Sequence, residues 1–338
     1  MPEGISYSRL RPQEQQAYKV ILRAFESYST EIDASFLPSN IDIIKTISSV
    51  LGDNPSFAYF DKTQIRSITS MWGKKYQLIA AQRGIPAAKV YNAVNQKALE
   101  IVSAIKGNTG NQYEQLLKAY EYLQDNVIYD SAELQACAKN GRSKNTSSHN
   151  AYGALMSNLA VCDGFASAFC LIAQKLGFEC TCLSGKSSHR FIDFAEHSWN
   201  IIKINQKYYH IDITWDANQS REMGIHSFDY FLLDDDEISA DHEWDFNLYP
   251  TCSYNDMNYF IKKGCFANNL SQVDSLFRSA IANNVCPVRI KLSQAVELPH
   301  NAEDSIAQSL ADIMLESGKN AEIRYSWNEK TRCFFAIY

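Results

Sequence analysis

Two cysteines lie close together in the stretch AVCDGFASAFC, residues 160–170, and differ in their position relative to a predicted helix. Cys162 precedes or opens that helix, where the positive end of the helix dipole favours a thiolate over a thiol. Cys170 falls in the middle of the helix among apolar side chains, and we expect it to pack as a small hydrophobic residue. Because a thiolate can attack a carbonyl carbon to form an acyl-thioester, Cys162 is the candidate for covalent chemistry.

A predicted β-hairpin carries the residues that would assist such a thiolate. The runs HSWNIIKI and KYYHIDITW are rich in strand-forming residues, and only Asn205 and Gln206 separate them. Two residues of this kind predict a tight hairpin turn, although the signal is weaker than Asn-Gly because glutamine disfavours positive φ. In the resulting register Ile204 pairs with Lys207.

Extending this register along both strands places Trp199 opposite Asp212 and His197 opposite Thr214, with all four side chains on one face. His197 and Asp212 are then diagonal neighbours, about 7 to 8 Å apart at the backbone. An aspartate that orients a histidine, and a histidine that accepts the proton of Cys162, would complete a Cys-His-Asp triad. Each residue also has a structural explanation, as an inert cysteine, a surface histidine or a strand-end aspartate.

The elements that must position these residues can be read from the flanking sequence. The helix beginning near Cys162 is apolar on most sides and ends at Gly177, so it is predicted to be buried. Residues 179–185 predict a short strand. Residues 131–150 are polar, rich in Ser and Asn and without an apolar period, which predicts a long loop. His149 falls in this loop, where a surface position is expected.

Three regions are predicted along the chain. Residues 1–110 form a mainly helical N-terminal region, residues 111–253 form the core that contains the candidate site, and residues 254–338 form a small α/β unit. The elements predicted in the last region are helices near 271–284 and at 303–317, a strand at 288–292, and a final pair of strands.

Composition limits the classes of function. A chain of 338 residues suggests about two domains, and a net charge of −6 with a pI of about 5.7 argues against nucleic-acid binding. No apolar run is long enough to span a membrane, and the polar N-terminus lacks a signal core, so a cytoplasmic location is expected. Nine scattered cysteines indicate free thiols, and neither zinc spacing nor a calcium loop is present. No metal or cofactor is therefore predicted, and the oligomeric state stays open.

Four short motifs occur in a fixed order around the candidate site: AYGAL at 151–155, VCDGFA at 161–166, HSWN at 197–200 and YHIDITWD at 209–216. In type, order and spacing they resemble the bacterial members of the transglutaminase-like superfamily. The resemblance is most specific from about 112 to 250. It departs from many relatives at Asp163, where they carry Gln or Glu.

The resemblance implies a papain-like α+β fold, in which a nucleophile helix packs on an antiparallel sheet that carries the histidine and the aspartate. Cys162 would then be the nucleophile, His197 the base and Asp212 the residue that orients the base. The backbone N–H of Cys162 would contribute to an oxyanion hole.

Three aromatic residues receive weaker assignments from the same resemblance. Tyr152 matches a tyrosine of the family and would supply a second oxyanion donor, with a core position as the alternative. Trp199 and Trp215 would wall the site, with simple core packing as the alternative.

The predicted function is that of a thiol-dependent enzyme acting on a peptide or protein substrate through an acyl-thioester on Cys162. Hydrolysis by water, as in a cysteine protease or amidase, is favoured because nothing in the sequence identifies an amine site. Transamidation of protein glutamine, as in a transglutaminase, is the first alternative. An inactive scaffold that binds peptides in the same groove is the second.

Overall fold

The computed structural model describes residues 4–61, 64–71, 73–141, 143–189, 192–319 and 322–338. It divides the chain into two compact units, one formed by Met1–Ser227 and His242–Cys252, the other by Phe228–Asp241 and Ser253–Tyr338. Helices and strands are mixed in both units, and the predicted α+β class is confirmed. The predicted division into three regions stays a prediction.

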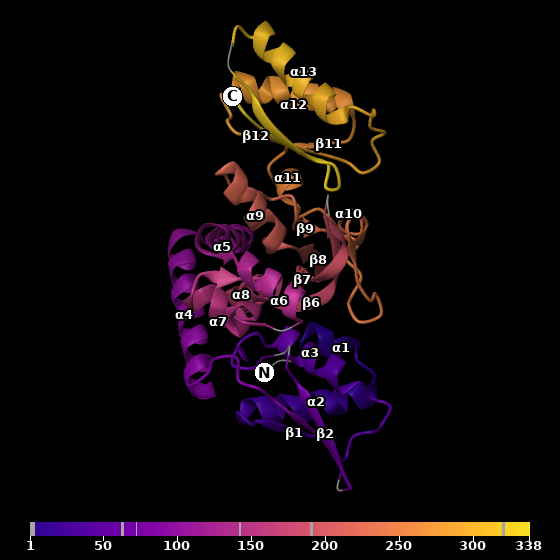
Figure 1. Ribbon diagram of the computed structural model, residues 1–338. Coiled ribbons are helices and arrows are strands. Elements are labelled where there is room, and N and C mark those ends of the chain that lie inside the picture. The colour runs from indigo at the N-terminus through magenta and orange to yellow at the C-terminus, as the bar shows by residue number, and fades with distance from the viewer. Residues whose placement is uncertain (1–3, 62–63, 72, 142, 190–191, 320–321) are drawn as a thin grey trace. The chain divides into compact units, whose positions relative to one another are not determined.

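A sheet and a buried helix form the centre of the first unit. Its antiparallel strands run in the order β10 (His242–Glu243), β6 (Glu179–His189), β7 (Ile192–Ile204) and β8 (Lys207–Ile211). Helix α8 (Cys162–Leu176) packs against β6 and β7, as expected for the predicted nucleophile helix. Helices α4 (Ala87–Asn108) and α5 (Gln112–Asn126) pack against α8 in turn (Figure 1).

The predicted hairpin is present in the predicted register but ends earlier than expected. Ile204 pairs with Lys207, and the ladder continues to the pair of Asn200 with Ile211. Asn205 and Gln206 have φ values of 50° and 64°, which is the backbone of a type I′ turn.

The strand predicted to continue to residue 215 stops at Ile211, so the predicted cross-strand partners of Asp212 and Thr214 are wrong. Asp212 is instead the N-cap of helix α9 (Ile213–Met223), and its side chain accepts hydrogen bonds from the N–H groups of Thr214 and Trp215. These bonds satisfy amides at the start of a helix and therefore favour a helix over further strand.

The long loop predicted at 131–150 is also wrong for much of its length. The segment contains helix α6 (Ser131–Asn140) and the 3₁₀ turn η1 (Thr146–His149), and helix α7 (Ala151–Met156) follows directly. Asp130 caps α6 by accepting the N–H of Glu133 at 3.0 Å. Two short parallel strands, β4 (Ile128–Tyr129) and β5 (Leu159–Ala160), bracket the segment. Side-chain capping thus stabilises helical structure in a polar segment that has no apolar period.

The N-terminal part contains helices, as predicted, together with an unanticipated small sheet. Helices α1 (Ile5–Arg9), α2 (Pro12–Glu26) and α3 (Ile43–Asp53) accompany strands β1 (Glu31–Asp33), β2 (Arg66–Ser70) and β3 (Gly73–Gln77), in the antiparallel order β1-β3-β2. The buried carboxylate of Asp53 accepts the N–H groups of Ser6 and Tyr7, each at 3.0 Å, and so caps α1 from the end of α3.

The second unit confirms the elements predicted for the C-terminal region. Helices α12 (Leu270–Ala282) and α13 (Ala302–Glu316) accompany a sheet in the order β11 (Phe266–Ala267), β12 (Val288–Leu292), β14 (Cys333–Ile337) and β13 (Arg324–Asn328). Three shorter elements, β9 (Phe231–Leu233), α10 (Asp235–Ile238) and α11 (Tyr259–Lys262), belong to the same unit. Apolar residues from α12, α13 and the strands form its core.

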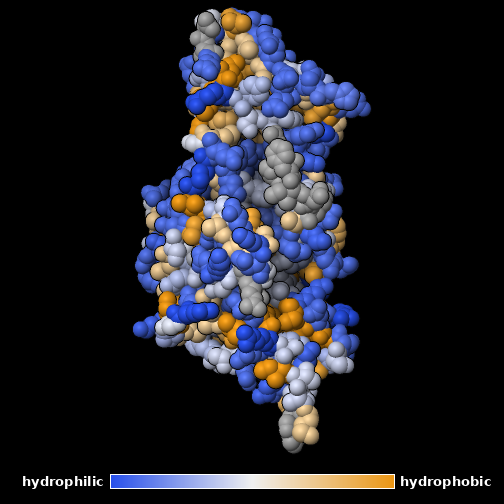
Figure 2. All heavy atoms as spheres, viewed as in Figure 1, coloured by the Kyte–Doolittle hydropathy of each residue, from blue (hydrophilic) through white to orange (hydrophobic). Residues whose placement is uncertain are grey.

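Hydrophilic residues cover most of the face seen in Figure 2, and apolar residues appear on it in small groups. Within the described ranges, no helix combines the length and the apolar character that a membrane crossing requires.

Candidate active site

Cys162 is the first residue of α8 and is half-buried. Its neighbour Val161 is the N-cap and makes no side-chain cap hydrogen bond, so Cys162 begins the helix at the positive end of its dipole. Two residues on, a Cβ on Gly164 would lie 2.3 Å from the carbonyl oxygen of Ser148. Glycine is therefore needed for η1 to pack this closely against the start of α8.

His197 and Asp212 are in direct contact. His197 Nε2 lies 2.6 Å from Asp212 Oδ2, and both side chains are almost completely buried. The other carboxylate oxygen, Oδ1, accepts the N–H groups of Thr214 at 2.9 Å and Trp215 at 3.4 Å. The thiol of Cys162 lies within hydrogen-bonding reach of His197. The structure thus brings together the three residues that the sequence singled out.

The electrostatics of this pair favour an imidazolium beside a carboxylate. Burial alone would lower the pKa of His197, but the charge and hydrogen bond of Asp212, with a contribution from Cys162, raise it to about 10. Burial would likewise raise the pKa of Asp212. The charge of His197 and hydrogen bonds from His197 and His242 outweigh burial and hold the pKa of Asp212 well below its usual range.

His242 is a third residue in contact with this pair, and it was not among the predicted site residues. It comes from β10, its side chain is fully buried, and its Nε2 lies 3.1 Å from Asp212 Oδ2. Its ring centroid lies 4.8 Å from those of Trp199 and Trp215. One carboxylate oxygen of Asp212 therefore faces two histidines. None of the four sequence motifs contains His242, so they did not predict this contact.

The rest of the HSWN motif attaches β7 to α8. Ser198 Oγ donates to Asp163 Oδ1 at 2.5 Å. Asn200 is fully buried, and its Nδ2 donates to the carbonyl oxygens of Ala166 at 3.0 Å and Thr181 at 3.3 Å. Alternate residues of β7, Ser198 and Asn200, thus bind α8, the helix that begins at Cys162.

The three aromatic candidates occupy different environments. Trp199 is fully buried and stacks on His197 with ring centroids 5.9 Å apart, while its Nε1 donates to His210 Nδ1 at 3.0 Å. Trp215 is half-buried, with its centroid 5.7 Å from that of His197. Tyr152 is half-buried in the first turn of α7. Both tryptophans contact the histidine, and the oxyanion role of Tyr152 stays a prediction.

Tyr129 is a second residue that sequence reasoning missed. It lies in β4 and pairs with Ala160, two residues before Cys162. Burial and the nearby charges of Cys162 and Asp163 raise the pKa of its hydroxyl, so the group remains a neutral donor at physiological pH. Tyr129 lies outside the four sequence motifs, so the motifs did not point to it.

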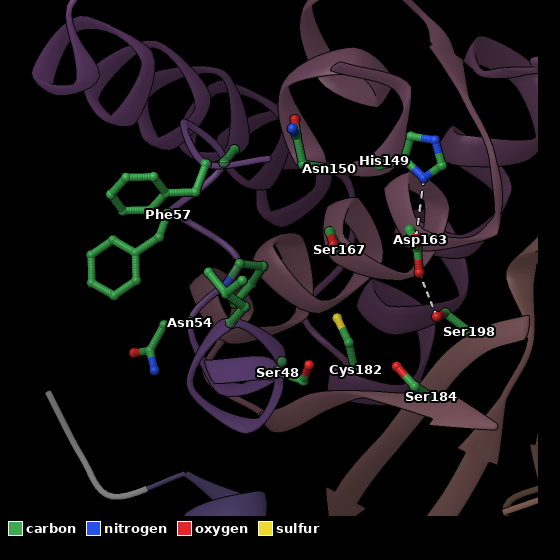
Figure 3. Close-up of a pocket in the computed structure, with 15 residues that line it drawn as sticks. Ser48, Asn54, Phe57, His149, Asn150, Asp163, Ser167, Cys182, Ser184 and Ser198 are labelled. Atoms are coloured by element: carbon green, nitrogen blue, oxygen red, sulfur yellow. Dashed lines mark hydrogen bonds and ion pairs between the residues drawn. The ribbon is translucent and has the colours of Figure 1, made fainter. Parts of the chain in front are cut away.

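A small pocket lies beside the hydrogen bond between Ser198 of β7 and Asp163 of α8. Figure 3 shows Asp163 between His149 and Ser198, with Cys182 and Ser184 nearby and Phe57 approaching from the N-terminal part of the chain. Its volume of about 40 Å³ accommodates a few water molecules, not a peptide side chain. We therefore do not assign it to substrate binding.

Comparison with protein families identifies the segment that contains this site. Residues 100–213 match the model of the Transglutaminase-like superfamily, and the match includes Cys162, His197 and Asp212. This segment is similar to a transglutaminase-like core, and the resemblance drawn from the sequence motifs is confirmed.

Solved structures show more distant likenesses. One is described as the crystal structure of a TGase, with 13% identity and a TM-score of 0.35, and the alignment covers 45% of this chain and 44% of that one. Another is named "a Putative Cysteine Protease from Cytophaga hutchinsonii", with 13% identity, a TM-score of 0.27 and coverage of 45% and 61%. The chain thus spans less than two thirds of either structure. No curated protein matches it.

Proposed function

We propose that the protein is a thiol-dependent enzyme that cleaves peptide or amide bonds through an acyl-thioester on Cys162. The observation that carries the proposal is the His197 ring, which contacts the Asp212 carboxylate at 2.6 Å and lies within hydrogen-bonding reach of Cys162. A nucleophile, a base and a group that orients the base are the minimum set for covalent acyl transfer. The family match supports thiol chemistry of this kind.

In the proposed mechanism His197 moves one proton. Its Nε2–H donates to Asp212, so Nδ1 is the nitrogen that takes the thiol proton of Cys162 and forms an imidazolium. The thiolate attacks the carbonyl carbon of the substrate, and the S–C bond forms as the carbonyl electron pair moves to oxygen. When the tetrahedral intermediate collapses, the C–N bond breaks and Nδ1–H protonates the departing amine.

The second half of the reaction returns the enzyme to its starting state. Water gives a proton to His197 and attacks the thioester carbon, the S–C bond breaks, and the acid product leaves. The backbone N–H of Cys162 stabilises the oxyanion in both halves.

The reaction class can be tested with a library of glutamine-containing peptides, with and without a labelled primary amine. We expect mass spectrometry to find hydrolysed peptides, and we expect acid quenching to trap a peptide that contains Cys162 and carries an acyl group. Water is present at far higher concentration than any amine, and among the described residues none forms an evident amine site.

Two outcomes would change this proposal. Incorporation of the amine in place of water would assign the protein to transamidation. Peptide binding without any acyl adduct or product would support an inactive scaffold. The Cys162→Ala variant is the control, because it keeps the fold but cannot form the thioester.

His242 provides a prediction of intermediate size. His242→Leu removes one donor from Asp212, and we expect kcat to fall about 10- to 100-fold, the equivalent of one hydrogen bond to a charged group. We treat His242 as a positioning residue because it touches the carboxylate and not the reacting atoms. His242→Gln, which retains a donor, should recover most of the lost rate at an unchanged KM. If both variants lose activity only in proportion to their loss of folded protein, the contact has a structural role alone.

A further inference from the structure

A mixed cluster of metal-ligand side chains lies next to the candidate active site. Glu133 and Cys137 are four residues apart on α6 and therefore share one face of the helix, and His149 ends η1. Cys137 Sγ lies 3.3 Å from Glu133 Oε1, His149 Nε2 lies 3.1 Å from the same oxygen, and Sγ and Nε2 are 4.0 Å apart. Three different donor atoms thus converge on one point.

The shorter backbone hydrogen bonds to Glu133 fall on one of its two oxygens. Oε2 accepts the N–H of Asn145 at 2.7 Å and that of Lys144 at 3.0 Å. The N–H of Lys144 also lies 3.2 Å from Oε1. Oε1 is the atom directed at Cys137 and His149. The side chain of Glu133 is only 1% exposed, so its orientation is fixed before any ligand arrives.

The ring of His149 has a carboxylate on each side. Nε2 faces Glu133, and Nδ1 lies 3.3 Å from Asp163 Oδ2. A neutral imidazole carries a single N–H and can donate to only one of them, so the second contact requires either another proton or a cation. A metal ion on Nε2 satisfies both sides, with Nδ1–H donating to Asp163. Histidines that bind metals commonly have such a carboxylate behind them.

The separations suit a small, borderline-soft cation. Bonds of about 2.3 Å to sulfur and about 2.0 Å to nitrogen or oxygen give ligand–ligand distances of roughly 3.3 to 3.6 Å around a tetrahedral zinc ion. The observed 3.1, 3.3 and 4.0 Å scatter around this range. A thiolate and an imidazole disfavour magnesium and calcium, which prefer oxygen ligands.

We propose that Glu133, Cys137 and His149 bind one zinc-type divalent ion, with water or an external ligand in the fourth position. Binding replaces the thiol proton of Cys137, which leaves to solvent, and does not change the oxidation state of either partner. The half-buried Cys137 and the 14% exposed side chain of His149 provide the route of entry. This site does not depend on the proposed enzyme function.

The ion would also strengthen a connection to the active site. Asp163 accepts from His149 at one oxygen and from Ser198 at the other, as Figure 3 shows. Asp163 follows Cys162 in α8, and Ser198 follows His197 in β7. The bound ion would therefore fix η1 against the two elements that position the thiol and the imidazole.

The test uses the full chain with Cys162→Ala, which removes the candidate nucleophile as a competing sulfur ligand. After reduction and removal of metals, Co²⁺ is titrated and the thiolate-to-cobalt charge-transfer band is followed in the near ultraviolet. We expect one Co²⁺ per chain and its displacement by Zn²⁺. Adding Cys137→Ser should abolish the band, whereas the matched Cys265→Ser, at another half-buried thiol, should keep it. Asp163→Asn should weaken binding about 10- to 100-fold.

A second measurement needs no change at the site itself. In the same Cys162→Ala protein, Zn²⁺ should protect Cys137 from iodoacetamide while the labelling of Cys286 continues, because Cys286 is exposed and serves as the internal control. Equal alkylation of Cys137 with and without Zn²⁺ would overturn the proposal. A cobalt band that persists after Cys137→Ser would overturn it as well. In either case His149 would be an imidazolium held between two carboxylates.

Discussion

Replacing Cys162 by alanine should abolish acyl-enzyme formation and reduce kcat/KM by about 10⁴- to 10⁶-fold, the range expected for loss of a covalent nucleophile. The sulfur is half-buried at the start of α8 and lies within hydrogen-bonding reach of His197. Acid-quenched mass spectrometry and the rate of peptide turnover provide the two measurements. Iodoacetamide should label Cys162 faster than any other thiol in the unmodified protein.

Cys170 offers the matched control on the same helix. It is fully buried, its S–H donates to the carbonyl oxygen of Cys180 at 3.2 Å, and burial raises the pKa of its thiol far above the usual value. Cys170→Ala should cost about 1 kcal/mol of stability and leave the activity of the folded protein unchanged. If Cys162→Ala still formed an acyl adduct, or if Cys170→Ala removed it, the assignment of the nucleophile would be wrong.

The sequence predicted the hairpin well because its register depends on local rules. Asn205 and Gln206 form the turn, and strict alternation then determines every pair as far as Ile211. The prediction failed at Asp212, where a run of strand-forming residues meets a helix cap. Strand propensity and helix capping favour different structures there. In the folded chain the carboxylate accepts N–H groups of α9, so the helix forms. His197 and Asp212 are in contact as predicted, but Asp212 is the N-cap of α9 and not a residue of the strand paired with β7.

Elements held together by distant side chains were the ones that the sequence did not reveal. Residues 131–150 have no apolar period, and their order comes from Asp130 and Glu133, whose carboxylates accept N–H groups of the same segment. His242 contacts Asp212 from 30 residues away, and Tyr129, which lies outside every motif, pairs with Ala160 two residues before Cys162. Contacts of this kind depend on tertiary packing, which neither periodicity nor spacing encodes.

The second large effect is expected at Asp212. In Asp212→Asn the amide oxygen can still accept the N–H groups that start α9, which directs the amide –NH₂ group toward His197 and His242. Because –NH₂ only donates, His197 must present a lone pair at Nε2 and carry its proton on Nδ1. The nitrogen that should take the thiol proton is then occupied, and we expect kcat/KM to fall about 10⁴-fold.

The pH dependence gives this prediction its sharpest test. In the unmodified protein the charge and hydrogen bond of Asp212, with a contribution from Cys162, outweigh burial and raise the pKa of His197 to about 10, so the ring is protonated at neutral pH. Without that charge, burial lowers the pKa of His197, the ring is neutral at pH 7, and alkylation of Cys162 by iodoacetamide should become slow there and recover only in alkaline solution. Asp216→Asn is the control, because Asp216 is equally buried in α9 but accepts from Tyr120 and Ser227. If Asp212→Asn kept the alkylation profile of the unmodified protein, or if Asp216→Asn shifted it equally, the carboxylate of Asp212 would not be what charges His197.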